Sequence, residues 1–481
     1  MQTTNDIVQK LWNLCSLLRE DGVTYHQYVT ELTYLLFLKM LKETGREDVL
    51  REGGRWDDLA GRSGVEQLEF YKRLLLNLGA LGSPRVRDIY TDASTTLRQP
   101  KTLTELVKHI DGLQWYSEAR EHMGDLYEGL LEKNATEVKS GAGQYFTPRP
   151  LVESMVELLK PQPGERVQDP AAGTGGFLIA ADRYVKEQTD KLFTLPARQQ
   201  QFQKHEAFYG MELVPDTRKL ALMNLMLHDI EGDLRLGDTL SPQGAALPPA
   251  DVILTNPPFG TKKGGGRPTR DDFTFPTSNK QLAFLEHIYR GLKPGGRAAV
   301  VVPDNVLFED NVGAAIRADL MDKCDLHTVL RLPTGIFYAQ GVKTNVLFFS
   351  RGKTDKGTTK AVWFYDLRAN MPSFGKRTPL TRQHFKEFEQ AFGEDPHGRS
   401  KRKDQGEQGR FRSLTREEIR VRGDNLDFSW LRDESQGSDE DLPQPEVVAA
   451  EIRILLETAL KEIALLTAAL DSGAPIQEEV A

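Results

Sequence analysis

From Gly141 onwards, short apolar runs alternate with helical patterns, and this alternation restricts the fold more than any other feature of the sequence. Five runs are typical of strands: residues 166–169, 207–212, 234–238, 251–256 and 297–303. Strands separated by helices pack as a parallel α/β sheet. Two more runs, 326–333 and 344–351, are separated by too little chain for a crossover helix. We therefore expect a mostly parallel, seven-stranded sheet with an antiparallel edge.

The segments on either side of this α/β domain, to which we assign residues 141–390, differ in character. Residues 1–140 carry apolar residues at three- and four-residue steps and predict an all-helical N-terminal domain. Residues 391–445 are polar and predict a linker region. Residues 446–481 repeat apolar residues at helical spacing and predict a C-terminal helix. That helix either docks a partner or folds back on its own chain.

Composition limits the classes of function. The 481-residue chain has a formal net charge of −8, and a protein that holds DNA phosphates alone is usually basic. A nucleic-acid substrate would therefore require a local basic patch or a partner, and a small-molecule enzyme fits the charge slightly better. The two cysteines, Cys15 and Cys324, belong to no Cys/His cluster, so we predict no metal site. The sequence shows neither a signal-peptide pattern nor an apolar run of bilayer length, and we expect a cytoplasmic protein without membrane contact.

A glycine-rich turn follows the first predicted strand. In VQDPAAGTGGFLIAA (167–181), Gly173, Gly175 and Gly176 let the backbone turn tightly and leave no Cβ against a ligand. Dinucleotide-binding enzymes use similar turns. Glu212 ends the second strand, where a carboxylate can hold both hydroxyls of a ribose. It lies farther from the glycines than the roughly 20 residues expected in a dinucleotide fold.

Polar side chains end four successive strands: Asp169, Glu212, Asp238 and Asn256. Any one of them has an ordinary explanation as a cap or a surface charge. Ligands of open α/β sheets bind at the carboxyl ends of the strands, so we expect the four to line one site. Asp238 is placed to meet the amino group of a cofactor adenine.

The run DVILTNPPFG (251–260) ends in a polar residue followed by two prolines and an aromatic. The side-chain oxygen of Asn256 and the carbonyl oxygen of Pro257 can accept hydrogen bonds, and Pro257 and Pro258 make the turn rigid. Phe259 can stack on a flat ring. Two acceptors beside a stacking face suit a planar, conjugated –NH2 group, whose nitrogen becomes more nucleophilic when its protons are held. The alternative is a proline turn that merely ends a strand.

Together the motifs resemble a known family. GQYFTPRP (143–150), DPAAGTGGFL (169–178) and TNPPFG (255–260) occur in the order found in S-adenosylmethionine-dependent amino-methyltransferases. The segments SNKQLAFLEHIYRGLKPGGRAAVVVPDNVLFE and LRLPTGIFYAQGVKTNVLFFSRG are similar to those of the modification (M) subunit of type I restriction–modification systems. The resemblance covers residues 5–370 and, in general character, the terminal helix. It implies a Rossmann-like methyltransferase that methylates adenine at N6 in DNA.

The resemblance also implies roles for individual residues. Cofactor contacts fall on Gln144, Tyr145, Phe146, Thr147, Pro148, Arg149, Asp169, Gly173, Thr174, Gly175, Gly176, Glu212 and Asp238. The catalytic residues that hold the target adenine are Asn256, Pro257, Pro258 and Phe259, and the base must be flipped out of the duplex to reach them. A second aromatic is expected on the far side of that base. Phe337 is our candidate and Tyr338 the alternative, although either is equally well explained as core.

The sequence contains no recognisable DNA reader. The basic stretch TKKGGGRPTR (261–270) either touches phosphates or is a plain solvated loop. The resemblance implies that a separate specificity (S) subunit chooses the sequence and that a second M subunit joins it on double-stranded DNA. It leaves open whether a restriction (R) subunit takes part. Two rival interpretations remain: an amino-methyltransferase for protein glutamine or RNA, and a cofactor-binding scaffold without catalysis.

Overall fold

The computed structural model describes residues 4–23, 27–113, 123–137, 146–259, 268–337, 342–372, 374–375 and 378–431. Residues 1–431 form one compact unit. The predicted C-terminal helix (446–481) lies outside the described residues, as do Gln144, Tyr145 and Tyr338. Among the helices described, none combines the length and the apolar character needed to cross a bilayer.

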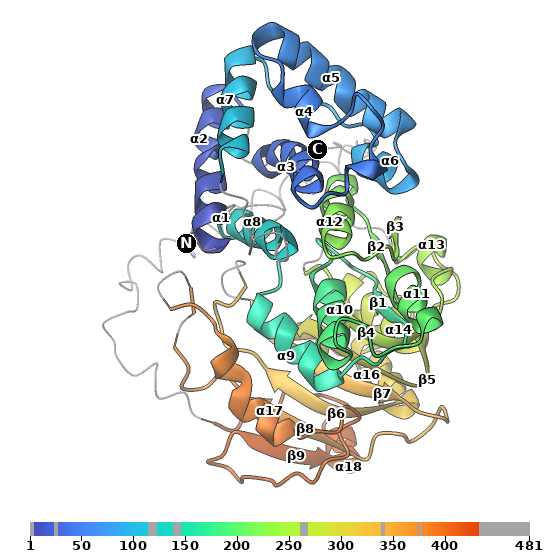
Figure 1. Ribbon diagram of the computed structural model, residues 1–481. Coiled ribbons are helices and arrows are strands. Elements are labelled where there is room, and N and C mark those ends of the chain that lie inside the picture. The colour runs from blue at the N-terminus through green and yellow to red at the C-terminus, as the bar shows by residue number, and fades with distance from the viewer. Residues whose placement is uncertain are drawn as a thin grey trace, which may run out of the picture. The chain divides into compact units, whose positions relative to one another are not determined.

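The regular secondary structure of the N-terminal region is helical in the described residues, as predicted (Figure 1). Its helices are α1 (Thr4–Asn13), α2 (Cys15–Glu20), α3 (Tyr28–Glu43), α4 (Trp56–Ala60), α5 (Gly64–Leu81), α6 (Pro84–Tyr90), α7 (Pro100–Asp111) and α8 (Met123–Glu137), with a 3₁₀ turn, η2 (Glu47–Val49). Helix α3 is buried along most of its length because it is apolar on nearly all sides. Its Lys39 is compensated by ion pairs with Glu43 (2.7 Å) and Asp111 (2.8 Å).

The second region contains one sheet, which has nine strands in the described part of the chain. The strands are β1 (Val167–Asp169), β2 (Phe208–Glu212), β3 (Asp233–Leu236), β4 (Ala250–Thr255), β5 (Leu292–Pro303), β6 (Cys324–Arg331), β7 (Thr344–Arg351), β8 (Ala361–Asp366) and β9 (Phe411–Thr415). Their order is β3-β2-β1-β4-β5-β7-β6-β8-β9. Strand β7 lies antiparallel between β5 and β6, which confirms the predicted antiparallel pair.

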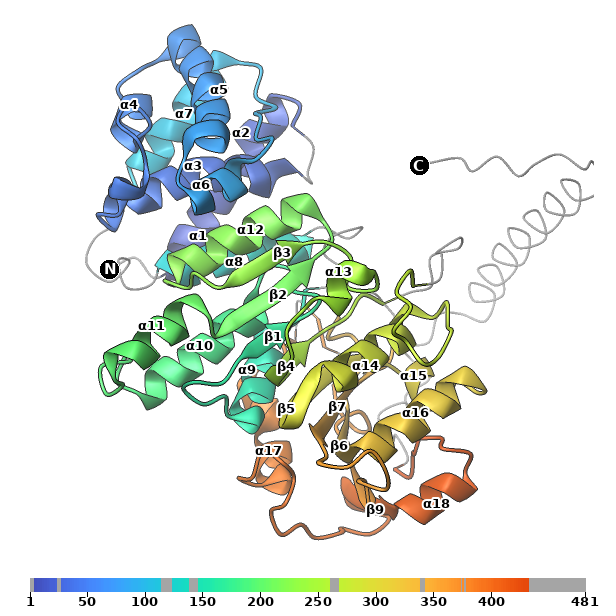
Figure 2. The same ribbon diagram turned by 90° about the vertical axis from the view of Figure 1, so that its right-hand side faces the viewer.

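Helices cover both faces of this sheet (Figures 1 and 2). They are α9 (Arg149–Leu159), α10 (Gly176–Gln188), α11 (Ala197–His205), α12 (Pro215–Leu227), α13 (Pro242–Ala245), α14 (Lys280–Gly291), α15 (Asn305–Phe308), α16 (Val312–Lys323), α17 (Lys386–Phe392) and α18 (Arg416–Val421), with a 3₁₀ turn, η4 (Arg382–Phe385). Successive strand residues point to opposite faces. Val252 and Leu254 therefore join the core beneath α9, α10 and α17, whereas Ile253 joins the core beneath α14 and α16.

The structure corrects two expectations. The sheet has nine strands rather than seven, because β8 pairs parallel with β6 and β9 pairs antiparallel with β8. The predicted linker (391–445) is wrong for residues 391–431, which contain β9 and α18 with buried Phe411 and Ile419. Few apolar residues suffice here because arginines bind backbone carbonyl groups: Arg410 donates to the carbonyl oxygens of Asp366 and Ala369, both at 2.8 Å.

The helical region packs against α12, through α3, α6 and α8. Arginine side chains bridge the contact. Arg46 donates to the carbonyl oxygen of Met226 (3.0 Å), and Arg85 donates to that of Gly232 (2.7 Å). Because α12 follows β2, this contact places the helical region close to the strand that carries Glu212.

Candidate active site

The predicted strand-end residues lie at one edge of the sheet. Strands β3, β2, β1 and β4 are adjacent and parallel, so their carboxyl ends meet there. Asp169 and Glu212 are the last residues of β1 and β2, Asn256 directly follows β4, and Asp238 stands two residues beyond β3. The fold thus brings together the four residues on which the sequence-based site was built.

The glycine turn between β1 and α10 requires glycine at two positions. Gly173 has φ +53° and Gly175 has φ +83°, in the left-handed region that side chains with a Cβ disfavour. The turn is fixed by its neighbours. Asn224 of α12 donates through Nδ2 to the carbonyl oxygen of Thr174 (3.0 Å).

Glu212 is held against this turn by backbone amides. Its Oε2 accepts from the N–H of Gly173 (2.9 Å) and its Oε1 from the N–H of Val214 (2.8 Å). Burial raises the pKa of Glu212, although the backbone N–H groups of Val214, Gly173 and Leu213 oppose that rise. The carboxylate still has lone-pair capacity for a further donor. Asp238 is exposed, and its Oδ1 accepts from the N–H of Leu240 (2.8 Å).

The side chain of Asp169 links strand β1 to strand β4. Its side chain is 1% exposed, and its Oδ1 accepts from Thr255 Oγ1 (2.7 Å) and from the N–H of Ala171 (3.0 Å). Burial raises the pKa of Asp169 to about 7. The carboxyl group therefore secures the end of β4, next to Asn256.

Asn256 is buried and makes a side-chain hydrogen bond. It is 7% exposed, and its Nδ2 donates to Thr147 Oγ1 (2.9 Å). Its Oδ1 is buried, and no group in the described part of the chain donates a hydrogen bond to it. Pro257 is buried, whereas Pro258 and Phe259 are half-buried.

Phe337 contacts Phe259 directly. The ring centroids are 5.6 Å apart and the planes meet at 83°, an edge-to-face contact. Phe337 is 3% exposed, so it is also a core residue. A flat base between two parallel rings is not the arrangement shown here, and the stacking role of Phe337 stays a prediction.

Arg149, predicted to contact a cofactor, is engaged elsewhere. Its guanidinium donates to Glu128 of α8 and to Asp125 Oδ1 (3.3 Å). Arg183 of α10 donates to the same two carboxylates, at 2.6 Å from Asp125 Oδ1 and 3.3 Å from Glu128 Oε2. We name these four residues the α8 ion cluster. Phe146 and Pro148 flank Thr147 and are half-buried.

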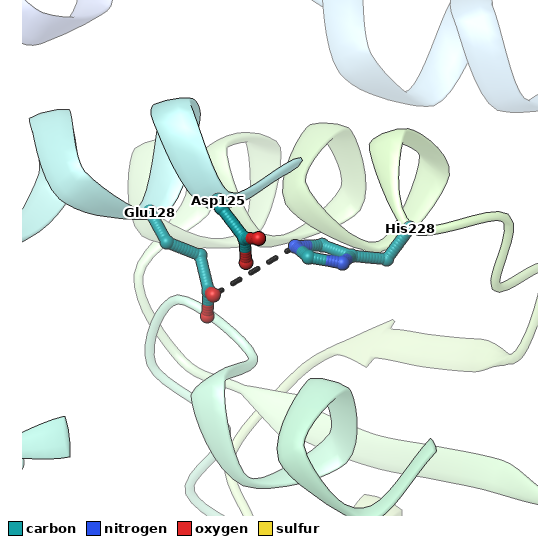
Figure 3. Close-up of side chains that lie close together, drawn as sticks. All are labelled: Asp125, Glu128 and His228. Atoms are coloured by element: carbon teal, nitrogen blue, oxygen red, sulfur yellow. Dashed lines mark ion pairs between the residues drawn. The ribbon is translucent and has the colours of Figure 1, made fainter. Parts of the chain in front are cut away.

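His228 lies beside the α8 ion cluster (Figure 3). Ligand atoms of Asp125, Glu128 and His228 lie within 4.8 Å of one another, which is a spacing that could suit a metal ion. Arg149 and Arg183 already neutralise both carboxylates, and a cation there would meet two guanidinium groups. Burial lowers the pKa of His228 to about 3, so at neutral pH its 3.8 Å contact with Glu128 is not an ion pair.

The sequence analysis did not identify three residues that support the site. Thr255 donates to Asp169, and Asn224 donates to the glycine turn. Arg368 donates to the carbonyl oxygen of Leu332, where the segment that carries Phe337 begins. Asn224 and Thr255 sit inside apolar runs, and a polar residue in such a run was the available signal.

Arg270 is the basic residue of the stretch 261–270 that lies among the described residues. It donates to both oxygens of Asp272 (2.7 and 2.6 Å), so it is not placed for phosphates.

Two family models match the chain. One, described as N-6 DNA Methylase, matches residues 118–440, and the other, described as HsdM N-terminal domain, matches residues 7–110. The type I restriction enzyme StySJI methylase subunit of Salmonella typhimurium is 55% identical over 510 residues, which cover 98% of this chain and 96% of that protein. The EcoKI methylase subunit of Escherichia coli K12 is 55% identical over 500 residues, covering 95% of this chain and 94% of that protein.

Solved structures that resemble this chain come from the same kind of protein. A crystal structure of the type I restriction enzyme EcoKI M protein aligns with a TM-score of 0.60 and 49% identity, covering 99% of this chain and 100% of that one. A chain from a study of complex assembly and conformational transition of the type I R-M system aligns with a TM-score of 0.71 and 28% identity, with the same coverage. The family predicted from the motifs is thereby confirmed: this chain belongs to the N6-adenine DNA methyltransferases and, among them, to the methylase (modification) subunits of type I restriction–modification systems.

Proposed function

We propose that this chain methylates the N6 nitrogen of an adenine flipped out of duplex DNA, with Asn256, Pro257, Pro258 and Phe259 holding the base. The observation that carries the residue assignment is the side-chain oxygen of Asn256, which is buried without a donor among the described residues. Such an unsatisfied acceptor costs about 1–3 kcal/mol. An incoming –NH2 group would satisfy it.

The chemistry follows from two acceptors held in a rigid frame. The amino nitrogen of adenine is a poor nucleophile because its lone pair is delocalised into the ring. Hydrogen bonds to Asn256 Oδ1 and to the carbonyl oxygen of Pro257 favour the pyramidal nitrogen, whose lone pair is available. Pro257 and Pro258 have a fixed φ and no N–H group, so the acceptors keep their positions. When bound, S-adenosylmethionine supplies a methyl group on a positively charged sulfur.

The neighbouring strand ends fit the adenosyl part of that cofactor. Glu212 accepts from backbone amides, and its carboxylate is suited to accept from a ribose hydroxyl as well. Gly173 and Gly175, on either side of Thr174, have no Cβ atom to obstruct a ligand, and Gly176 follows them. Asp238 is exposed and suited to accept from the adenine amino group. Gln144, Tyr145, Phe146 and Pro148 remain predicted contacts, and for Asp169 we propose an indirect role through Thr255.

The acidic charge of the chain favours partners that help it to hold DNA. Its net charge of −8 opposes unaided binding to phosphates. We propose that a specificity subunit chooses the DNA sequence, that a second copy of this chain joins it, and that a restriction subunit can be added. The homologous chain taken from work on type I assembly supports this arrangement. A cytoplasmic location is part of the proposal.

The test is methyl transfer from radiolabelled S-adenosylmethionine to DNA, by this chain alone and with its specificity subunit. We expect label on adenine N6, identified after nuclease digestion, only when the partner is present. Label on DNA without the partner would show that the chain reads DNA itself. Label on protein or RNA, with none on DNA, would contradict the proposed substrate.

A further inference from the structure

We infer that Thr147 is a positioning residue that orients Asn256, and that the helical domain holds Thr147 in place through Arg149. The inference rests on the proposed function, since it assigns a task to the neighbour of the proposed acceptor. It also differs from the sequence-based expectation, in which Thr147 contacts the cofactor. The experiment below separates these two roles.

The first step is the hydrogen bond between the two side chains. A carboxamide has two unlike ends, an –NH2 group that donates and an oxygen that accepts. Thr147 Oγ1 accepts from Asn256 Nδ2 at 2.9 Å. This bond restrains the side-chain torsions of Asn256 and leaves the oxygen end for a target amine. A carboxamide turned by 180° would present its –NH2 group to another –NH2 group, and two donors cannot pair.

Burial makes this orientation matter. Asn256 is 7% exposed, so water has little access to replace a lost partner of its amide. An exposed asparagine side chain would rotate freely among its torsions. Here the bond to the Thr147 hydroxyl keeps the carboxamide of Asn256 in one place in the described structure.

The second step is the anchor of Thr147 itself. Thr147 lies two residues before Arg149, the first residue of α9. Arg149 donates to Glu128 and to Asp125 on α8 of the helical domain. Arg183, on the helix that follows the glycine turn, shares both carboxylates. Figure 3 shows Asp125 and Glu128 extending together from α8.

The α8 ion cluster thus connects three parts of the molecule: the helical domain, the segment with Thr147, and the helix that begins at the glycine turn. Glu128 has a side chain that is 12% exposed, so its bonds are little screened by solvent. Burial raises the pKa of Glu128, and Arg149 and Arg183 oppose that rise. A change at Glu128 should therefore reach Asn256 by way of Arg149 and Thr147.

The experiment compares Thr147→Val with Thr147→Ser in complex with the specificity subunit and duplex DNA. Single-turnover methyl transfer is measured at saturating cofactor, and cofactor affinity is measured by equilibrium binding. We expect Thr147→Val to lower the rate about five- to tenfold, the value of one lost hydrogen bond, with unchanged cofactor affinity. Thr147→Ser keeps the hydroxyl and should restore the rate. Thr189→Val, which removes a buried hydroxyl bonded to the Val185 carbonyl, is the control.

Two results would overturn the positioning role. One is a wild-type rate in Thr147→Val. The other is weaker cofactor binding with an unchanged rate at saturation, which would make Thr147 a cofactor contact. Asn256→Ala is run in parallel as a reference: if it transfers methyl groups at the wild-type rate, the proposed function has failed. If it is inactive while Thr147→Val is unaffected, only this inference has failed.

The anchor is tested by Glu128→Gln, with Glu157→Gln on the exposed face of α9 as the matched control. We expect Glu128→Gln to slow transfer less than Thr147→Val does, and to add little in the double variant, since both act through one chain of contacts. Unfolding midpoints identify a loss caused by instability. Rates that multiply in the double variant, or a wild-type rate in folded Glu128→Gln, would show that the helical domain does not hold Thr147.

Discussion

At the scale of single residues, the site is assembled by side chains that tie neighbouring strands together. Asp169 ends β1, and its carboxyl group accepts from the hydroxyl of Thr255, the last residue of β4. The residue after Thr255 is Asn256. A buried carboxyl group at the start of the glycine turn therefore fixes the strand that presents the proposed acceptor.

The buried carboxyl group of Asp169 predicts that the stability of the folded chain depends on pH. Burial raises the pKa of Asp169 to about 7, well above its value in an unfolded chain. Between about pH 4 and pH 7 the folded state binds a proton that the unfolded state lacks, so this group makes stability fall as pH rises through that window. Asp169→Asn cannot ionise. We expect the wild type to lose up to about 2–3 kcal/mol more than the variant between pH 5 and pH 8.

Urea unfolding at both pH values checks this expectation. The difference between the two proteins is the relevant quantity, because all other titrating groups are shared. An equal loss of stability in wild type and Asp169→Asn would mean that folding does not raise the pKa of Asp169.

Some of these site residues could be predicted from the sequence and others could not, for a physical reason. Glu212, Asp238 and Asn256 were predictable because each follows an apolar run that a parallel sheet would bury. The bond between Thr147 and Asn256 joins residues 109 positions apart. Periodicity and motifs indicate which side chains are polar, but they do not fix which pairs meet.

At the scale of elements, the added strand β8 supports the segment that carries Phe337. Arg368, two residues beyond β8, donates to the carbonyl oxygens of Leu332 (3.1 Å) and Thr344 (3.0 Å), which bracket that segment. It also binds both oxygens of Asp304, at 3.0 and 2.9 Å. Burial raises the pKa of Asp304, but Arg368 outweighs this and holds that pKa below its usual range.

We therefore expect Arg368→Gln to weaken productive DNA binding rather than cofactor binding. Loss of the ion pair loosens the segment with Phe337, and stacking on a flipped base is worth about 1–3 kcal/mol. The KM for DNA should rise about tenfold, with cofactor affinity unchanged. Arg351→Gln, at the opposite end of β7, is the control. If Arg368→Gln leaves both the KM for DNA and the cofactor affinity unchanged, the segment with Phe337 has no role at the DNA.

Strands β8 and β9 were missed for different reasons. In β8, AVWFYD, four of the six residues are buried and the run is typical of a strand, but it stands between polar stretches beyond the predicted sheet. In β9, FRSLT, Phe411 is the buried residue, and the surrounding segment is highly charged. These strands are stabilised by arginines bound to backbone carbonyl groups, a pattern that composition does not reveal.

At the scale of the whole molecule, the helical domain docks on helix α12. Arg85 reaches across this contact to the buried carbonyl group of Gly232 (2.7 Å), and burial lowers the pKa of Arg85. The domains themselves were predictable from helical and strand-like periodicity. Their docking was not, since Arg85 and Gly232 are 147 positions apart.

Removal of this bridge should destabilise the folded chain. Arg85→Ala leaves the carbonyl oxygen of Gly232 buried without its donor, at an expected cost of about 1–3 kcal/mol. Arg87→Ala, on the exposed side of the same helix, should cost little. The free energy of unfolding in urea measures both. Equal values for the two variants would mean that the domain contact does not depend on Arg85.

The central claim is that the oxygen of Asn256 activates the target amine, and single-turnover methyl transfer by Asn256→Ala and Asn256→Asp tests it most directly. Both variants are measured with the specificity subunit and duplex DNA, alongside equilibrium cofactor binding. We expect Asn256→Ala to lose at least about a hundredfold in rate, as for other deleted transition-state partners, while Asn256→Asp, which keeps an acceptor oxygen, retains more. Cofactor affinity should be unchanged in both. Transfer at the wild-type rate by Asn256→Ala would contradict the account.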